Sequence, residues 1–315
     1  MKKAILRDVF GFSIIELLIA TMLALLLVTA ILNVTLQGSR LSQQLRLRSE
    51  LLETGRYLIN SMDYEISHAG YYGPLDLAKI TDSVRADLCS GIDTSAIQNT
   101  LNFPVDGLDN LALNDKVCNG DRALLGSDVL LIRHADKTPM TPDQPLIGKQ
   151  HYIQALGDQY IIDRGANAAA FSLKQKDNST LAEIRPWQQA IYYVSKNHVL
   201  KRRRLLGGKY SPSEPLAEGV DDFQIMYGIA RPTGNRGATS GQAVDFVSLP
   251  ATVDEWRNIV AIKYYFLLSS TENFTALVGD KIYHYGDKSA VTFDDNKKRS
   301  LFSGYTRLRN NVPNQ

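Results

Sequence analysis

The amino-acid sequence predicts an α+β protein, in which one very long N-terminal helix packs on a head of antiparallel β-sheet with large loops. An apolar run extends over residues 12–32, and a one-sided apolar stripe at helical spacing continues it over residues 33–68. Strand-like segments follow without helical repeats between them, which favours antiparallel pairing. We therefore expect one helix over residues 12–68 and a globular head over residues 69–315.

The first half of this helix is long enough to cross a membrane. Residues 12–32 number 21, or about 31 Å of helix at about 1.5 Å per residue, which matches a hydrocarbon core of about 30 Å. Glu16 is the only charged residue in this run. A carboxylate in lipid costs about 2.5–3.5 kcal/mol even on insertion scales, so Glu16 is expected to have a function. The alternative is an ordinary signal-anchor helix with a chance glutamate.

The charges before the apolar run predict the orientation of the chain. Lys2, Lys3 and Arg7 stand there against one acid, Asp8, and positive residues stay on the cytoplasmic side of a membrane. We therefore expect a cytoplasmic N-terminus, with everything after Leu32 on the other side. The whole chain has a net charge of +2, which these four residues account for (3 − 1 = 2). The remainder is formally neutral, which argues against nucleic-acid binding.

Two cysteines, Cys89 and Cys118, lie in the exported part of the chain, 29 positions apart. In an oxidising compartment a disulfide is the simplest interpretation. It would close a loop of about 30 residues and contribute about 3–4 kcal/mol. A metal-binding pair is the alternative, although the spacing lacks the CxxC form.

The second half of the helix is amphipathic, and its end is marked by glycine and proline. Gly55 interrupts this half and weakens the helix by about 1 kcal/mol relative to alanine, while Gly70, Gly73 and Pro74 end it. The apolar stripe consists of Leu41, Leu45, Leu52, Ile59, Met62 and Ile66.

The head is expected to be a set of strands joined by long loops. Residues 71–119 are turn-rich and acidic, and predict an irregular loop with short helical pieces, held by the disulfide. Residues 231–242 are rich in Gly, Ser and Thr, and predict a mobile loop. Apolar and β-branched runs predict strands over residues 128–133, 150–154, 159–163, 190–195, 199–206, 220–229 and 258–269. Of these, 150–163 and 190–206 are each expected to form a hairpin.

The sequence contains no recognisable catalytic or cofactor-binding motif, so we expect neither an enzyme nor a cofactor. The histidines form no paired metal motif, and no phosphate-binding loop or nucleophile elbow is present. The acidic clusters lack the alternating ligands of a calcium loop, so we expect them to be structural. They are Asp221-Asp222, Asp294-Asp295-Asn296 and Asp106–Asn110 with Asp115. An anchored periplasmic enzyme or binding protein is the alternative from another functional class.

One basic run, Lys201-Arg202-Arg203-Arg204, stands out in the head. We expect it to form a solvated edge strand that its charges protect from aggregation. Contact with a partner subunit is the alternative.

The junction Gly11-Phe12-Ser13-Ile14-Ile15-Glu16 resembles the class III leader junction of type IV pilins and of type II secretion pseudopilins. Residues 216–227 and 259–268 resemble segments shared by PilW-type minor pilins and J-type pseudopilins, and residues 305–310 resemble the closing segment of PilW proteins. The resemblance implies a leader of residues 1–11, peptidase cleavage between Gly11 and Phe12, N-methylation of Phe12, and a role for Glu16 in subunit assembly.

The resemblance also implies a function. A PilW-type minor pilin helps to initiate type IV pilus assembly, supports twitching motility and lies at or near the fibre tip. Its expected partners are minor pilins of the PilV, PilX and FimU types, the major pilin, the prepilin peptidase, the inner-membrane assembly platform and a tip adhesin. The expected location is the inner membrane, with the head in the periplasm, and then the surface fibre. A J-type pseudopilin of a type II secretion system is the alternative.

Overall fold

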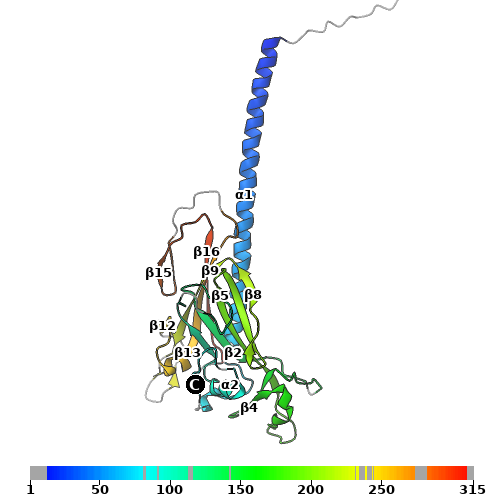
Figure 1. Cartoon of the computed structure of the whole chain (residues 1–315), viewed down its shortest axis with the longest axis vertical. Helices are drawn as coiled ribbons and strands as arrows, with labels where there is room; N and C mark the ends of the chain where they lie inside the picture. The colour runs from blue at the N-terminus through cyan, green and yellow to red at the C-terminus, as the bar shows by residue number, and fades with distance from the viewer. Residues whose placement is uncertain are drawn as a thin grey trace, which may run out of the picture. The chain divides into compact units, whose positions relative to one another are not determined.

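A computed structural model describes residues 13–80, 83–90, 92–112, 116–141, 143–230, 232–233, 238–239, 243, 245–273 and 282–310. The chain divides into two compact units, Met1–Glu50 and Leu51–Gln315. One helix, α1 (Ile14–His68), contains the boundary between the two units (Figure 1). Among the described residues, α1 is the one helix that could cross a membrane by its length and composition. The predicted long helix is confirmed.

The part of α1 in the first unit presents its apolar side chains to the surroundings. Its large hydrophobic residues are exposed from Ile14 to Leu36, with exposed fractions between 51% and 81%. The hydroxyl groups of Thr21, Thr29 and Thr35 donate to main-chain carbonyls three or four residues earlier in the helix. These polar groups are therefore satisfied inside the helix, as a segment without water around it requires.

The second unit contains two main antiparallel sheets. The first sheet has the order β1-β2-β5-β3-β4, with β6 also paired to β5, and β7 and β8 paired to β6. Its strands are β1 (Val105–Leu108), β2 (Val129–Ala135), β3 (His151–Leu156), β4 (Gln159–Arg164), β5 (Ile184–Ser195), β6 (Val199–Leu206), β7 (Lys209–Tyr210) and β8 (Glu214–Glu218).

The second sheet has the order β12-β9-β13-β16. Its strands are β9 (Val220–Ile229), β12 (Asp245–Val247), β13 (Ile259–Ser269) and β16 (Arg299–Arg307). The smaller elements are β10 (Pro232–Thr233), β11 (Ala238–Thr239), β14 (Tyr283–Tyr285), β15 (Lys288–Val291), α2 (Thr94–Asn99), α3 (Val253–Arg257) and the 3-10 helices η1 (Leu77–Lys79) and η2 (Gly165–Ala170). One long helix followed by antiparallel sheets confirms the predicted α+β class.

The predicted strands are present, and both predicted hairpins pair as expected, β3 with β4 and β5 with β6. His198 adopts a positive φ of 59° in the turn between β5 and β6. β5 begins at Ile184, six residues earlier than predicted, because Ile184, Arg185 and Pro186 pair with β3. The described part of the long loop, residues 71–119, contains α2, η1 and also β1, which was not predicted.

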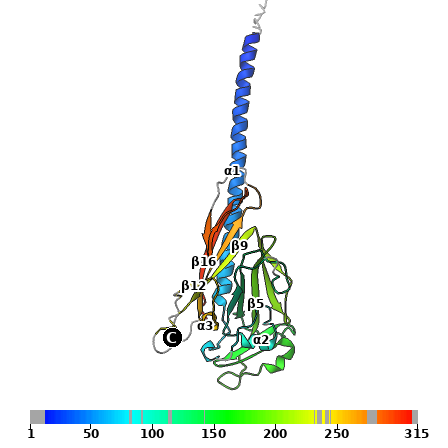
Figure 2. The same cartoon turned by 60° about the vertical axis from the view of Figure 1, so that its left-hand side comes forward.

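Two hydrophobic cores lie on opposite faces of the first sheet. One contains the α1 residues Leu58, Met62 and Ile66 together with side chains from both sheets. Figure 2 shows the two sheets as separate layers, marked by β5 and by β9 and β16. The other core contains Trp187 and Ile191 of β5 and covers the opposite face with residues from the disulfide loop. Because both faces of β5 are covered, its tyrosines Tyr192 and Tyr193 are both buried.

Gly55 of α1 has a packing role in this core. A Cβ added there would lie 2.3 Å from Cε1 of Phe302, so a larger residue would force the Phe302 ring out of its place against the helix. The hydroxyl of Thr306 donates to Asp63 Oδ1, two turns further along α1. β16 therefore runs along α1 in the same direction as the helix.

Candidate assembly site

The candidate assembly site lies at the start of α1. The carbonyl of Ser13 accepts the amide groups of Glu16 and Leu17 at 3.0 and 3.1 Å, so the helix begins there and Glu16 stands in its first turn. A carboxylate in this position is favoured by the helix dipole. Glu16 is exposed, as are the apolar residues around it. Gly11 and Phe12, the predicted cleavage site, lie outside the described residues.

The exposed apolar surface of the first unit requires a cover. Soluble monomers rarely expose contiguous apolar patches of more than a few hundred Å², whereas here large hydrophobic residues are exposed at nearly every turn from Ile14 to Leu36. A lipid bilayer or the apolar helices of other subunits would bury this surface. Both environments also have a low dielectric constant, in which the charge of Glu16 requires a counterion.

The predicted disulfide between Cys89 and Cys118 is present. The sulfur atoms are bonded at 2.02 Å, and the two Cα atoms are 5.0 Å apart. Asp87 Oδ1 accepts the amide of Cys89 at 2.8 Å, and Cys118 adopts a positive φ of 48°. The bond fixes two segments of an irregular loop that covers one face of the first sheet.

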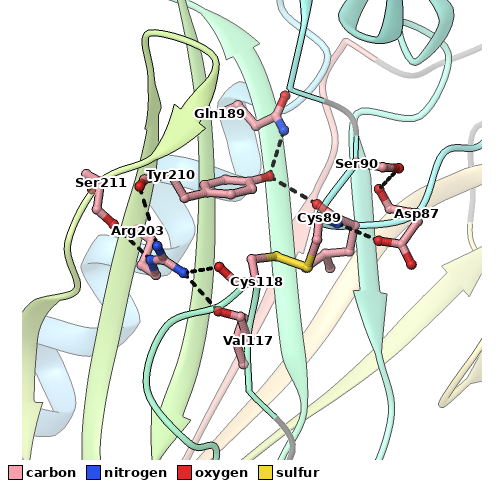
Figure 3. Close-up of a disulfide and its surroundings, with 10 residues drawn as sticks. Asp87, Cys89, Ser90, Val117, Cys118, Gln189, Arg203, Tyr210 and Ser211 are labelled. Atoms are coloured by element: carbon pink, nitrogen blue, oxygen red, sulfur yellow. Dashed lines mark hydrogen bonds between the residues drawn. A yellow bond between two sulfur atoms is a disulfide. The ribbon is translucent and has the colours of Figure 1, made fainter.

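Arg203 of β6 holds the loop at the second cysteine (Figure 3). Its Nη1 donates to the carbonyls of Val117 and Cys118 at 2.9 and 2.7 Å, and its Nε donates to the carbonyl of Ser211 at 2.8 Å. Only 8% of Arg203 is exposed. The guanidinium group therefore fills a gap between strand and loop, and its charge is balanced by carbonyl dipoles.

Tyr210 of β7 holds the loop close to the first cysteine. Its hydroxyl donates to the carbonyl of Leu88 at 3.1 Å and accepts from Gln189 Nε2 at 2.8 Å. Burial raises the pKa of this hydroxyl, so it stays protonated as a donor. Both ends of the disulfide are thus tied to the first sheet by side chains.

The basic run of β6 is not a solvated edge strand, and that prediction was wrong. β6 lies between β5 and β8, so its two edges are both paired. Lys201 Nζ contacts Asp121 of the disulfide loop at 2.7 Å, whereas Arg202 contacts Glu65 of α1 at 3.6 Å and Glu214 at 3.0 Å. The alternation of the strand therefore directs Lys201 and Arg203 to the loop and Arg202 to the helix. Only Arg204 is exposed.

Glu65 joins the last turns of α1 to the first sheet. His134 Nε2 lies 3.5 Å from Glu65 Oε2, and Arg202 Nη1 lies 3.6 Å from Oε1. Burial acts to raise the pKa of Glu65, but the hydrogen bond and charge of His134, with the charge of Arg202, outweigh it and lower the pKa. The carboxylate therefore stays ionised and paired.

Asp128 joins the two sheets, a role that the sequence did not indicate. Its Oδ2 accepts the amide of Ile225 in β9 at 2.8 Å, and its Oδ1 accepts the amide of Asn110 at 2.9 Å. The residue is 1% exposed. Burial, with smaller contributions from Asp109 and Asp222, raises the pKa of Asp128 to about 8.

The acidic clusters named from the sequence lie in ion pairs and hydrogen bonds of the fold. Asp221 contacts Arg299 Nε at 2.5 Å and His198 Nδ1 at 3.0 Å. Asp295 also contacts Arg299, and Asp106 contacts Arg85. Within the described part of the chain, no three His, Cys, Asp or Glu residues are grouped so as to hold a metal ion. Asp115 lies outside the described residues.

Comparison with known proteins finds a family match over part of the chain. The order of elements, one long apolar helix followed by antiparallel sheets, is the predicted one. Residues 191–310 match the family model of the type IV pilus-assembly protein W, PilW. Over these residues, which include β6, β9, β13 and β16, the predicted resemblance to PilW-type proteins is confirmed.

A solved structure, a type IV-like pilin from Thermus thermophilus, is distantly similar. It shares 12% sequence identity with this chain at a TM-score of 0.38, and the similarity covers 85% of this chain and 98% of the other. The search of curated proteins gave no match.

The family match and the fold support a role as a type IV pilus pilin, a structural and not a catalytic class. They also support a pilus-associated membrane protein that associates with other pilus components.

Proposed function

We propose that this chain is a minor pilin that helps to initiate type IV pilus assembly and lies at or near the fibre tip with other minor pilins. One observation carries the proposal: the chain combines an apolar helix, whose side chains are exposed, with a head that matches the PilW family over residues 191–310. In a free soluble protein this apolar surface would stay exposed to water, which is unfavourable. In a pilin subunit it is buried first in the membrane and then in the fibre.

Maturation would begin in the inner membrane. The basic leader remains in the cytoplasm, residues 12–32 span the bilayer, and residues 69–315 fold in the periplasm. The Cys89–Cys118 disulfide fits an oxidising compartment. The prepilin peptidase would cleave between Gly11 and Phe12 and methylate the new amine of Phe12.

Cleavage gives Glu16 a possible counterion. The new amine of Phe12 can carry a positive charge. In an apolar environment an unpaired carboxylate costs several kcal/mol, and a paired one much less. The amine of one subunit would therefore dock on Glu16 of another.

The pairing energy would select one register between neighbouring helices. A carboxylate left unpaired among apolar side chains costs about 2.5–3.5 kcal/mol, and each 1.36 kcal/mol corresponds to a factor of ten. A slip of one helical turn moves the amine about 5.4 Å away, which breaks the pair. The correct register would then be favoured by roughly a hundredfold.

The test of this mechanism is Glu16→Ala expressed in the host. Leader cleavage should be largely intact, because the peptidase acts on the preceding junction, while the amount of the chain recovered in sheared fibres should fall sharply. Glu53→Ala is the matched control, since it removes another exposed acid from the same helix. Normal piliation and normal incorporation of the Glu16→Ala chain would count against the pairing.

A second variant tests processing itself. Gly11→Ala, or a larger residue at this position, should block cleavage, so the chain should keep the mass of the precursor and stay in the inner membrane. A mature chain of unchanged mass would reject the cleavage site.

A deletion strain separates the pilus from type II secretion. We expect loss of twitching motility with normal exoprotein secretion. Loss of secretion with normal motility would assign the chain as a J-type pseudopilin.

A further inference from the structure

β16 forms one edge of the second sheet, and β13 is its only strand partner within the described residues. Their pairing is unbroken from Arg299 to Arg307. The amide of Leu308 donates to the carbonyl of Val260, and the amide of Ser270 donates to the carbonyl of Lys298. These two bonds show which residues of β16 direct their main-chain groups toward β13, and every second residue between them points the other way. The main-chain N–H and C=O groups of Leu301, Ser303 and Tyr305 therefore point away from β13.

This edge lacks the features that normally protect a free strand. Natural edges are short, kinked, or interrupted by proline and charge. β8 carries Pro215 between Glu214 and Glu218, and β12 has only 3 residues. β16 has 9 residues without proline or bulge, and its charges stand only at its two ends. Such an edge is a template for another strand.

The edge opens into a groove beside α1. Asp63, Tyr64 and Ser67 of the helix line it together with residues 305–309, and its volume is about 680 Å³. Tyr64 is 48% exposed and Tyr305 is 52% exposed. Tyrosine is enriched at protein interfaces. A strand added to β16 would have the helix as a wall and the exposed ring of Tyr64 to pack on, whereas the ring of Tyr305 lies 6.2 Å from that of Phe246 on the other face of the sheet.

The direction of β16 argues against pairing with the same edge of a second copy. Two-fold pairing would place the two β16 strands, and hence the two molecules, in opposite directions. β16 runs along α1 in the direction of the helix, as the contacts of Phe302 and Thr306 show. Copies anchored through the start of the same helix all point the same way. We therefore take the occupant to be a strand of a different protein, and pairing with another strand of a second copy is an outcome of the test.

The charge at the end of the groove selects the chemistry of that strand. Arg309 is exposed, lines the groove and forms no ion pair with another described residue. Asp63, the acid in the groove, already accepts hydrogen bonds from Tyr264 and Thr306. The groove therefore offers positive charge at the end of β16, which favours an acidic side chain or a terminal carboxylate.

We propose that the free edge of β16 receives an extended strand from a different protein of the assembly, with an acidic group beside Arg309. This proposal rests on the proposed function, because an assembly must exist to supply the strand. Main-chain hydrogen bonds would provide the affinity, and the helix wall with Arg309 would provide selectivity.

Site-specific photo-crosslinking of the full chain in its host tests the proposal. A benzoylphenylalanine at position 64 should crosslink to a defined extended segment of another protein in sheared fibres, and the same probe at exposed Leu181 should not. Mass spectrometry identifies the crosslinked peptide. A crosslink to a second copy of this chain, or fibres that contain the chain without any crosslink at position 64, would overturn the proposal.

Ser303→Pro tests the main-chain contacts directly. It removes an N–H that points away from β13, which an edge strand tolerates, so the fold should be kept and the crosslink at position 64 should fall about tenfold, the equivalent of about one hydrogen bond. Ser303→Ala keeps the N–H and should crosslink normally. An undiminished crosslink in a folded Ser303→Pro chain contradicts the proposal.

Arg309→Glu is a second test of the proposal if the Ser303→Pro chain does not fold. It reverses the charge on an exposed side chain, and the crosslink should again fall about tenfold. An unchanged crosslink would contradict the proposal. The proposed function fails separately, because a chain that is not a pilin would not enter fibres at all.

Discussion

Replacing Arg203 by methionine should destabilise the head far more than the same change at Arg204. Arg203 donates three hydrogen bonds of 2.7–2.9 Å to the carbonyls of Val117, Cys118 and Ser211. Hydrogen bonds from a charged donor contribute about 1.5–3 kcal/mol each. Because methionine also relieves the cost of burying a charge, we expect a net loss of about 2–4 kcal/mol.

The assay is equilibrium denaturation of the full chain in detergent, under oxidising conditions. Arg204→Met is the matched control, because Arg204 is the next residue of the same strand and is exposed. Its unfolding free energy should stay within about 0.5 kcal/mol of the wild type. A difference of less than about 0.5 kcal/mol between Arg203→Met and Arg204→Met would refute the assigned role of Arg203.

A double-mutant cycle extends the test to the disulfide. Replacing both Cys89 and Cys118 by serine should cost about 3–4 kcal/mol, from the length of the closed loop. Arg203 and the disulfide restrain the same segment, so their combined loss should be smaller than the sum by about 1–2 kcal/mol. Strict additivity would mean that Arg203 and the disulfide act on independent parts of the head.

Two other predictions concern packing and pH. Gly55→Ala should destabilise the head by about 1–3 kcal/mol, because the added Cβ would lie 2.3 Å from the Phe302 ring, and this loss should exceed the gain of about 1 kcal/mol in helix propensity. Gly38→Ala is the control and should show no loss of stability, because no atom lies within 4 Å of its added Cβ. Equal denaturation midpoints for the two variants would contradict the packing role of Gly55. Burial raises the pKa of Asp128 to about 8, so between pH 5 and 8 the folded chain keeps a proton on Asp128 that the unfolded chain releases. The free energy of unfolding should therefore fall as the pH rises, by up to about 1.4 kcal/mol per pH unit. Asp128→Asn should flatten that slope in denaturation curves, whereas an unaltered slope would show that Asp128 titrates normally.

The sequence predicted the helix and most of the strands because their patterns are long and regular. The apolar run and the stripe ending near Ile66 admit only a helix, and the hairpins of the first sheet have clear turns. The disulfide followed from the two cysteines of an exported head. These features depend on local pattern and on composition, which the sequence displays directly.

The missed elements depend on packing partners far away in the sequence. β16 contains Gly304, which weakens its strand pattern, yet a Cβ there would lie 2.3 Å from the Tyr264 hydroxyl. β1 contains Gly107 for the same kind of reason, since a Cβ there would lie 2.1 Å from the Tyr227 hydroxyl. In both strands a residue that argues against a strand locally is required by an aromatic side chain of the second sheet.

The basic run shows a similar limit for the candidate site. Four consecutive cations suggest a solvated surface, but three of them have partners far away in the sequence, on α1 and in the segment around Cys118. Lys201 contacts Asp121, Arg202 contacts Glu65, and Arg203 contacts the carbonyl of Cys118. The sequence around residues 201–204 does not indicate these partners, so the contacts of the four side chains could not be predicted from it.

The most direct test of the account is the mass of the N-terminal peptide of this chain, isolated from fibres of its host. We predict a peptide that begins at Phe12 and is heavier than the unmodified peptide by one methyl group. A peptide that begins at Met1, or an unmethylated Phe12, would contradict the account.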